Sequence, residues 1–402
     1  MQTSSNAEKS FDLSVDQLLA QARQETGLEH FGDLSFLPAL SVLLDAVKTE
    51  AQLNAFGHAV VTDHTLRALR NRLWCQTYFE QNPLCSKRPI VAPVIIIGPH
   101  RSGTTRLQRM LATDARLQHL KTWEGINPGP RLDLPDFGTS IRYHEVKQMF
   151  DRRESVYPGV AAHPMHPDWP EEDMLLLNQS FSGFLPIGMY YVPSYYDWFI
   201  QTDKSPAYRY MADLLNLISA TRGDQDSKRW ILKNPQHMLD LDVLLKVFPD
   251  AKLIFTHRDP IKTVGSVMSL MWHYAVQHTD MPRRAQIASI WLDFCERMAR
   301  HCMRARASIP QSQQLDIYYD DMNRDWRSCL RRVYAFCEME WSAETEHSMA
   351  AWLESSEREN LQGLHRYSLE DFGTTEQEVE ARMGFVRQRY AIPYEQPCAA
   401  AR

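Results

Sequence analysis

Short apolar runs separated by helical patterns organise the middle of the chain. Residues 94–97 are four β-branched residues in a row, which is typical of a strand buried on both faces of a parallel sheet. Further strands are expected at 118–121, 229–232, 252–256 and 315–318. Helical patterns follow at 104–112, 237–248, 261–275 and 325–337. Strands that alternate with helices predict an α/β fold with a central parallel sheet.

Helical patterns without a convincing strand occupy the flanking regions. Helices are expected at 15–24, 37–47 and 65–78, so we expect an N-terminal helical region over 1–90 that packs on the main domain. The α/β domain is expected over 91–402, with further helices at 342–358 and 375–389. A long insertion at about 125–225 carries helical patterns at 171–181 and 206–220. Insertions at the carboxyl ends of parallel strands usually shape the substrate site.

Composition and charge narrow the function classes. The chain has 402 residues and a formal net charge of −6, which argues against general nucleic-acid binding. No stretch approaches the ~20 apolar residues of a membrane span, and the first residues lack the apolar segment of a secretory signal. The seven cysteines include no Cys-x-x-Cys pair, so we expect reduced thiols in a cytoplasmic protein and no metal site. The oligomeric state stays open.

A glycine loop joins the first predicted strand to the helix after it. Gly98-x4-Gly103-Thr104-Thr105 has the spacing of a phosphate-binding P-loop, whose backbone N–H groups point at an anion. The lysine that a P-loop carries after its second glycine is replaced by Thr104, and Arg101 supplies a cation inside the loop. We therefore expect a phosphate or sulfate site that does not perform ordinary ATP·Mg chemistry. The candidate ligand-binding residues are His100, Arg101, Ser102, Gly103, Thr104 and Thr105.

A second anion signal follows the fourth predicted strand. Arg258 lies at the carboxyl end of this strand, Pro260 marks the start of a helix, and Ser266 lies about two turns into it. An arginine and a hydroxyl at a strand end form a good phosphate clamp. The alternative is a surface ion pair between Arg258 and Asp259.

Together these motifs resemble the sulfotransferases that use 3′-phosphoadenosine-5′-phosphosulfate (PAPS), in particular a bacterial branch similar to tyrosylprotein and heparan sulfotransferases. The loop 101–105 is similar to the 5′-phosphosulfate loop of that family, and Arg258 with Ser266 matches its 3′-phosphate pair. The resemblance covers about 90–390 and implies a P-loop-like three-layer fold. The segment 365–373 is similar to a late loop over the cofactor, which would add Arg366 and Tyr367 as cofactor-binding residues. The Arg-Lys-Gly start of the late loop in small-molecule sulfotransferases is absent.

The resemblance also implies two catalytic positions. Glu124 lies where related enzymes have the base that takes a proton from the acceptor, although it could instead be a solvated loop residue or pair with Arg131. Lys233 lies where the family has a lysine against the leaving phosphate, with a surface lysine as the alternative. Glu171 and Glu172, expected in the first turn of a helix, are the alternative bases.

The expected function is transfer of a sulfuryl group from PAPS to a hydroxyl or amine of a small-molecule or glycan acceptor, which releases adenosine 3′,5′-bisphosphate. Arg101 and Lys233 would neutralise the developing charge without a metal. An aromatic block at 190–199 either lines an apolar acceptor pocket or forms core. Two alternative functions remain: a P-loop kinase or NTPase that requires Mg²⁺, and a sulfotransferase-like protein that binds nucleotide without catalysis.

Overall fold

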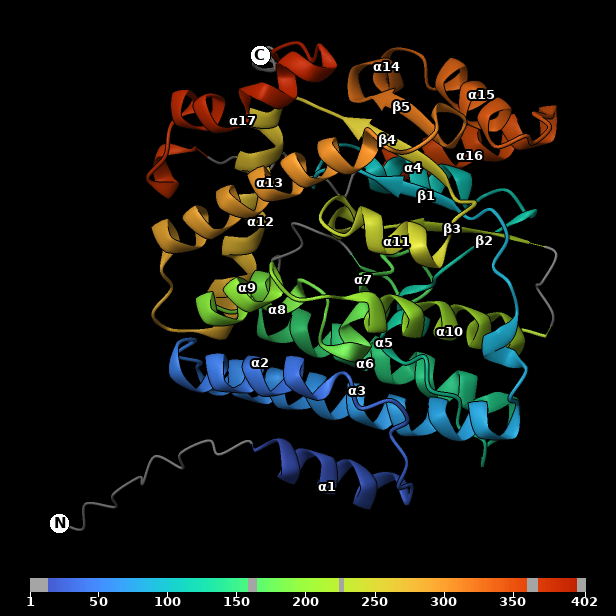
Figure 1. Ribbon diagram of the computed structural model, residues 1–402, viewed down its shortest axis with the longest axis vertical. Coiled ribbons are helices and arrows are strands. Elements are labelled where there is room, and N and C mark those ends of the chain that lie inside the picture. Colours follow the sequence, from blue (N-terminus) through green and yellow to red (C-terminus); the bar gives the residue numbers. More distant parts are fainter. Residues whose placement is uncertain (1–13, 158–164, 224–227, 360–367, 396–402) are drawn as a thin grey trace.

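The predicted strands form one all-parallel sheet at the centre of the molecule (Figure 1). The computed structural model describes residues 14–157, 165–223, 228–359 and 368–395. Within them the sheet has five strands in the order β2-β3-β1-β4-β5. The strands are β1 (Val94–Ile97), β2 (Leu117–His119), β3 (Arg229–Lys233), β4 (Lys252–His257) and β5 (Gln314–Tyr318). The predicted α/β class is confirmed.

The strand order places β1 between β3 and β4, because the chain leaves β1 to form β2 and β3 on one side and then crosses to β4 on the other. The carboxyl ends of these three neighbouring strands therefore open at one edge. In α/β sheets the crevice at such a reversal of strand order is the usual ligand site.

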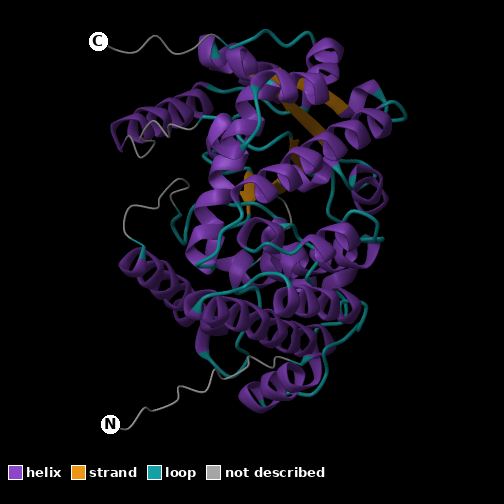
Figure 2. Cartoon of the chain, turned by 90° about the vertical axis from the view of Figure 1, so that its left-hand side faces the viewer, coloured by secondary structure: helices purple, strands orange, loops and turns teal. Residues whose placement is uncertain are grey.

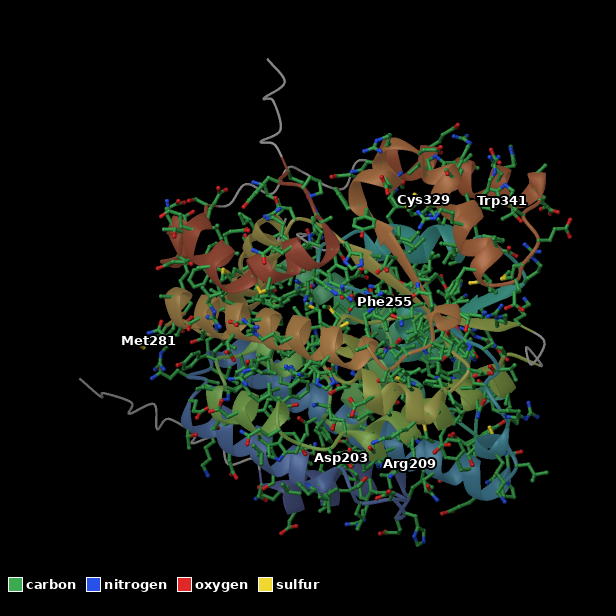
Figure 3. The ribbon with its side chains drawn as sticks, turned by 45° about the horizontal axis from the view of Figure 1, so that its top comes forward. Asp203, Arg209, Phe255, Met281, Cys329 and Trp341 are labelled. Atoms are coloured by element: carbon green, nitrogen blue, oxygen red, sulfur yellow. The ribbon has the colours of Figure 1, made fainter. Side chains whose placement is uncertain are left out.

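Alternate residues of β1 enter two different cores, as the period of two in a strand requires. Val94 and Ile96 pack with helices α4 and α15, whereas Ile95 and Ile97 belong to the larger core that includes α12 and α13. Figure 2 shows the strands enclosed between helices on both sides. In Figure 3, Phe255 of β4 lies among the packed side chains of the larger core. Cys329 of α15 belongs to the smaller core, which Val94 and Ile96 enter. Burial on both faces explains why the strands lack polar alternation.

Helices surround the sheet in four groups along the chain. The first group is α1 (Val15–Thr26), α2 (Leu37–Thr49), α3 (Ala55–Gln81) and the 3₁₀ turn η1 (Cys85–Lys87), followed after β1 by α4 (Thr104–Leu111). The second, between β2 and β3, is α5 (Thr122–Ile126), η2 (Pro135–Gly138), α6 (Thr139–Val156), α7 (Met174–Leu177), η3 (Asn178–Ser180), α8 (Leu185–Met189), α9 (Pro193–Phe199) and α10 (Ser205–Thr221). The third is η4 (Pro235–Met238), α11 (Leu241–Val247), α12 (Pro260–His278), α13 (Arg284–Arg306) and η5 (Gln311–Gln313). The fourth is α14 (Tyr319–Arg324), α15 (Trp326–Phe336), α16 (Ala343–Glu359), η6 (Glu370–Phe372) and α17 (Glu376–Tyr390).

Several parts of the insertion differ from the sequence-based expectation, among them the short helices α8 and α9, which it did not include. The helix expected at 171–181 is only α7 and η3, because Pro170 and Glu171 are extended chain that pairs with Leu120 and Lys121, just after β2. The long helix α6 has no counterpart in the expectation, since only Arg142 and Val146 are buried along it and its apolar periodicity is weak. α6 nevertheless lies beside α3 in the lower half of Figure 1 and helps to form the cavity described below.

Candidate active site

The glycine loop lies where β1 ends and α4 begins, as the sequence predicts. Gly98 must be a glycine, because a Cβ there would lie 2.0 Å from Thr256 Oγ1 on β4. Gly103 has a φ of +89°, a left-handed conformation that favours glycine. The Ser102 hydroxyl lies 2.6 Å from Thr256 Oγ1 and donates to the Pro99 carbonyl. The loop is thus held tightly against β4, and the first N–H groups of α4, which have no partner within the helix, lie at its end.

The predicted second anion clamp lies directly against this loop. Arg101 donates from Nε to Ser266 Oγ at 3.2 Å, and Arg258 donates from Nη1 to the Arg101 carbonyl at 2.8 Å. The three residues come from the β1–α4 loop, α12 and the β4–α12 turn. Because the carboxyl ends of neighbouring parallel strands share one sheet edge, the fold gathers these separated residues at one place.

Arg258 also holds a carboxylate from the far end of the chain. Its Nε and Nη2 donate to the two carboxylate oxygens of Glu395 at 2.6 and 2.9 Å, a bidentate arrangement. The Glu395 N–H donates to Asp259 at 2.7 Å, and Asp259 in turn accepts from Arg387 of α17 at 2.8 Å. Arg258 and Asp259 thus each have a partner from the C-terminal part of the chain, and Asp259 is buried.

Lys233 lies at the end of β3 and is fully buried, which excludes the alternative of a surface lysine. Its Nζ donates to Glu172 Oε1 at 2.6 Å and lies 3.5 Å from the Thr105 hydroxyl of the glycine loop. One ammonium group thus connects the loop to the carboxylate of an acidic segment that is distant in sequence.

A buried polar network fixes the turn that carries Lys233. Asp173 accepts from the Lys233 N–H at 3.0 Å and lies 3.1 Å from His237 Nε2. The chain of contacts continues through Tyr208, 2.9 Å from His237 Nδ1, to Asp240, which pairs with Lys204. All of these side chains are buried. A connected buried network of this kind favours one arrangement of the turn and so fixes the backbone that carries the Lys233 side chain.

Glu124, the base that the family resemblance implies, has a different environment from Glu172. Its carboxylate is buried and pairs with Arg222, while Oε2 also accepts from the Lys121 N–H at 3.0 Å. Arg131, the expected alternative partner, pairs instead with Glu145 at 3.1 Å. Glu124 does not belong to the lining of the large cavity beside the loop. Its role stays a prediction, and these contacts give it a structural function in addition.

Glu171 and Glu172 lie on an extended segment before α7, which begins at Met174. The segment is held by a β-bridge between Lys121 and Pro170 and by the Glu171 N–H, which donates to the Leu120 carbonyl at 3.0 Å. Both glutamates line the cavity. The acidic pair is therefore explained by its place at the sheet edge rather than by a helix dipole.

His100 contacts the cavity side of the loop. Its ring meets Phe184 and Trp291 edge-to-face, with centroid distances of 5.0 and 5.4 Å. Burial, with the nearby charges of Lys233 and Arg101, lowers its pKa to about 3, so the imidazole is neutral. Neither ring nitrogen has a hydrogen-bond partner among the described residues. A buried polar group of this kind is suited to a ligand.

A cavity of about 720 Å³ begins at His100, Glu171 and Glu172 and extends into the helical half of the molecule. Its walls come from α3, α6, α7, α8 and α12. Of the aromatic block at 190–199, Tyr190 alone belongs to this lining, whereas Tyr195 and Phe199 are packed in the core. The wall contributed by α3 had no signal in the sequence, because α3 precedes the glycine loop and carries no motif.

Three further expectations concern the late loop, the cysteines and membrane-spanning helices. Arg366 and Tyr367 lie outside the described residues, so their roles stay predictions. Within the described ranges six cysteines are buried and form no disulfide: Cys75, Cys85, Cys295, Cys302, Cys329 and Cys337. Among the helices of those ranges, none combines the length and apolarity needed to cross a bilayer.

Known proteins with a similar sequence or fold are sulfotransferases. The model of the sulfotransferase family matches residues 93–343. The chain is 31% identical to a crystal structure of sulfotransferase STF1 from Mycobacterium tuberculosis, which covers 93% of this chain and 99% of that one with a TM-score of 0.80. The chain is also 27% identical to the crystal structure of sulfotransferase STF9 from Mycobacterium avium. That match covers 98% of this chain and 100% of STF9, with a TM-score of 0.83.

A curated relative gives a more limited match. The omega-hydroxy-beta-dihydromenaquinone-9 sulfotransferase of Mycobacterium bovis is 25% identical over 258 residues, which is 60% of this chain and 61% of that protein. The match thus spans about three fifths of the relative. Since the family model covers the sheet, the glycine loop and the carboxyl ends of β3 and β4, the chain belongs to the sulfotransferase family.

Proposed function

We propose that this protein transfers a sulfuryl group from PAPS to a hydroxyl group of an acceptor held in the cavity. The observation that carries the proposal is the position of Lys233. Its ammonium group contacts Thr105 of the glycine loop on one side and Glu172 of the cavity lining on the other. Anion site and acceptor cavity therefore meet at one buried cation.

The residues present fit a donor with two separate anionic ends. Gly98 lets the loop pack against Thr256 of β4, and Gly103 takes the left-handed conformation that opens α4, so the backbone N–H groups of the loop can face an anion. Arg101, Ser266 and Arg258 form a second cluster beside it, joined by contacts of 2.8 to 3.2 Å. The loop with Arg101 would hold the 5′-phosphosulfate, and Arg258 with Ser266 would hold the 3′-phosphate. The bound donor would supply an activated sulfuryl group.

The protein's own groups then have distinct tasks. Glu172 accepts the proton of the acceptor hydroxyl, because it is the carboxylate that both lines the cavity and touches Lys233. Lys233 and Arg101 provide fixed positive charge where negative charge grows on the leaving phosphate. The neutral His100 imidazole offers a hydrogen bond at the border of loop and cavity, which orients the hydroxyl.

A hydroxyl acceptor is also supported by the curated relative, whose printed name describes a hydroxylated quinone as its acceptor. We extend to this chain only the reacting group, since the identity is 25%.

Calorimetry tests the donor assignment. Adenosine 3′,5′-bisphosphate should bind at least tenfold more tightly than AMP, because only the bisphosphate can engage Arg258 and Ser266. Arg258→Met should remove that difference and leave AMP binding unchanged. Equal affinities of the wild-type protein for the two nucleotides would refute the assignment, and magnesium-dependent ATP turnover would favour a kinase or NTPase.

A further inference from the structure

The cavity is long relative to its volume. One face of α3 lines it from Phe56 to Trp74, and 18 residues of helix at 1.5 Å each correspond to about 27 Å. A sphere of the same volume, about 720 Å³, would be only about 11 Å across. The space is therefore an elongated channel rather than a compact pocket.

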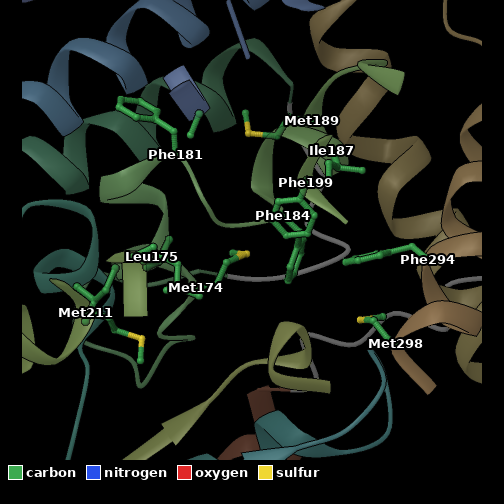
Figure 4. Packing of buried hydrophobic residues seen from close by; sticks show 14 of the residues in the cluster. Met174, Leu175, Phe181, Phe184, Ile187, Met189, Phe199, Met211, Phe294 and Met298 are labelled. Atoms are coloured by element: carbon green, nitrogen blue, oxygen red, sulfur yellow. The ribbon is translucent and has the colours of Figure 1, made fainter. Parts of the chain in front are cut away.

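The walls along this channel are mainly hydrocarbon and thioether. Figure 4 shows several of the buried side chains involved, Met174, Phe181, Phe184 and Met189 among them. The other apolar lining residues include Val60, Met149, Phe150, Leu185, Leu270 and Met271. Methionine side chains are unbranched and adapt to flexible ligands. Such a surface gains little from a sugar, whose hydroxyl groups would each need a partner.

Polar and charged side chains occur in several parts of the lining, among them Asp63, Arg67, Arg153 and Gln277, and two groups bear on the acceptor. The first is the reacting centre, with His100, Glu171 and Glu172. The second is a set of ion pairs, Glu25–Arg70 at 2.6 Å and Arg131–Glu145 at 3.1 Å, whose side chains are 21 to 39% exposed. Because these pairs reach solvent, they mark the opening of the channel between α1, α3 and α6.

We infer that the acceptor is a long-chain lipid alcohol. Its hydroxyl reaches Glu172 and His100, its apolar chain lies along α3, and its other end approaches the ion pairs at the opening. The inference rests on the proposed sulfuryl transfer and names the acceptor class for it. It follows from the length of the channel, the predominance of apolar groups in its walls and the presence of His100 and Glu172 at its inner end.

Binding of simple alcohols to the full chain tests this acceptor class without the donor. Titration with n-hexanol, n-decanol and n-tetradecanol, each below its aggregation limit, should show Kd falling with chain length. The expected step is up to roughly fourfold per methylene, which corresponds to about 0.8 kcal/mol for a buried CH₂. Methyl glucoside should not bind measurably, and decahydro-2-naphthol should bind more weakly than decanol, which has the same number of carbons.

A pair of variants tests where the alkyl chain of the alcohol lies in the channel. Met149→Trp on α6 should fill part of the lining and reduce tetradecanol affinity at least tenfold, with little effect on hexanol. Lys147→Trp on the same helix is the matched control, because Lys147 is exposed and pairs only with Asp151 at the surface. If Met149→Trp fails to fold by circular dichroism, Val60→Phe on the α3 wall replaces it.

The possible outcomes distinguish a failure of the lipid alcohol as acceptor from a failure of the proposed sulfuryl transfer. Affinity independent of chain length, tighter binding of decahydro-2-naphthol than of decanol, or an unchanged profile in the blocked variant would overturn the lipid alcohol. If tetradecanol binds as expected but PAPS yields no sulfated alcohol, the channel assignment stands and the proposed transfer fails. If PAPS sulfates only short or polar alcohols, the transfer stands and the lipid acceptor fails.

Discussion

At the scale of residues, the account depends on one cation and two candidate bases. Lys233 contacts Glu172, whereas Glu124 pairs with Arg222 away from the cavity lining. A base must reach the proton that it removes, so the geometry favours Glu172. Glu124 at the same time holds Arg222 in a buried pair, and its loss would leave that cation without its carboxylate.

Glu172→Gln should lower kcat by roughly 10²- to 10⁴-fold, the usual contribution of a general base, while the affinity for adenosine 3′,5′-bisphosphate changes little. Glu171→Gln is the matched control on the same segment and should keep turnover within about tenfold. Steady-state kinetics with calorimetry measures both quantities. A loss of turnover in Glu171→Gln or Glu124→Gln equal to that expected for Glu172→Gln would assign the base to that residue instead.

Lys233→Met keeps the length of the side chain and removes its charge. We expect kcat to fall roughly 10²- to 10³-fold, because a fixed charge that stabilises the transition state is lost. The Kd of the bisphosphate should change less than tenfold. A defect confined to nucleotide binding, with normal kcat at saturation, would argue against the proposed role.

At the scale of elements, the site consists of strand ends closed by segments from distant parts of the chain. The residues after α17 return to the β4–α12 turn, where Glu395 holds Arg258 and Asp259. The carboxylate of Glu395 thus pairs with Arg258, the arginine that we assign to the 3′-phosphate. Binding of the donor must displace it, so this contact lowers the observed affinity.

Glu395→Gln should therefore tighten binding of adenosine 3′,5′-bisphosphate by roughly three- to tenfold, a modest effect because the pair is partly exposed. AMP affinity should not change, since AMP has no 3′-phosphate. Glu376→Gln, which alters a 3.8 Å surface pair with Lys262 on the neighbouring helices, is the control. Weaker binding of the bisphosphate by Glu395→Gln would instead mean that Glu395 supports the site.

The elements that could be predicted are those whose local pattern determines them. The bounds of β1 agree with the expectation residue for residue, because a strand buried on both faces is visible in four consecutive apolar positions. The meeting of Arg101 with Ser266 was also accessible, since both follow neighbouring parallel strands. The contact of Lys233 with Glu172 could not be predicted from the sequence. It joins residues 61 positions apart, and it depends on the bridge between Lys121 and Pro170. α6 escaped prediction because few of its residues are buried.

At the scale of the whole molecule, the helical half and the sheet share one core. Leu40 of α2, Leu69 of α3 and Phe255 of β4 belong to the same buried cluster. The N-terminal helices are thus packed into the main fold, and α3 forms a wall of the cavity as well. Buried histidines within this core couple its stability to pH.

His278, at the end of α12, is buried, and burial lowers its pKa from 6.5 to about 4. The unfolded chain binds a proton at His278 below pH 6.5, whereas the folded protein does so only near pH 4. The free energy of unfolding should therefore fall on acidification between these values, by about 1.4 kcal/mol per pH unit for this group.

Urea denaturation at pH 7, 6 and 5 measures this dependence. His278→Asn can still donate to the Tyr274 carbonyl, which His278 Nδ1 approaches at 2.7 Å, and should flatten the slope by about one proton. His100, His119 and His64 contribute in the same direction, because burial lowers the pKa of each. An identical slope in the variant would show that His278 titrates normally in the folded protein.

The most direct test of the account is transfer itself. The purified full chain is incubated with PAPS and n-tetradecanol, and the products are separated and identified by mass. The account predicts tetradecyl sulfate and adenosine 3′,5′-bisphosphate in equal amounts, with no requirement for Mg²⁺ and with at least a hundredfold loss of rate in Glu172→Gln. Absence of sulfated product from wild-type protein that binds both ligands, or equal rates in the variant, would contradict it.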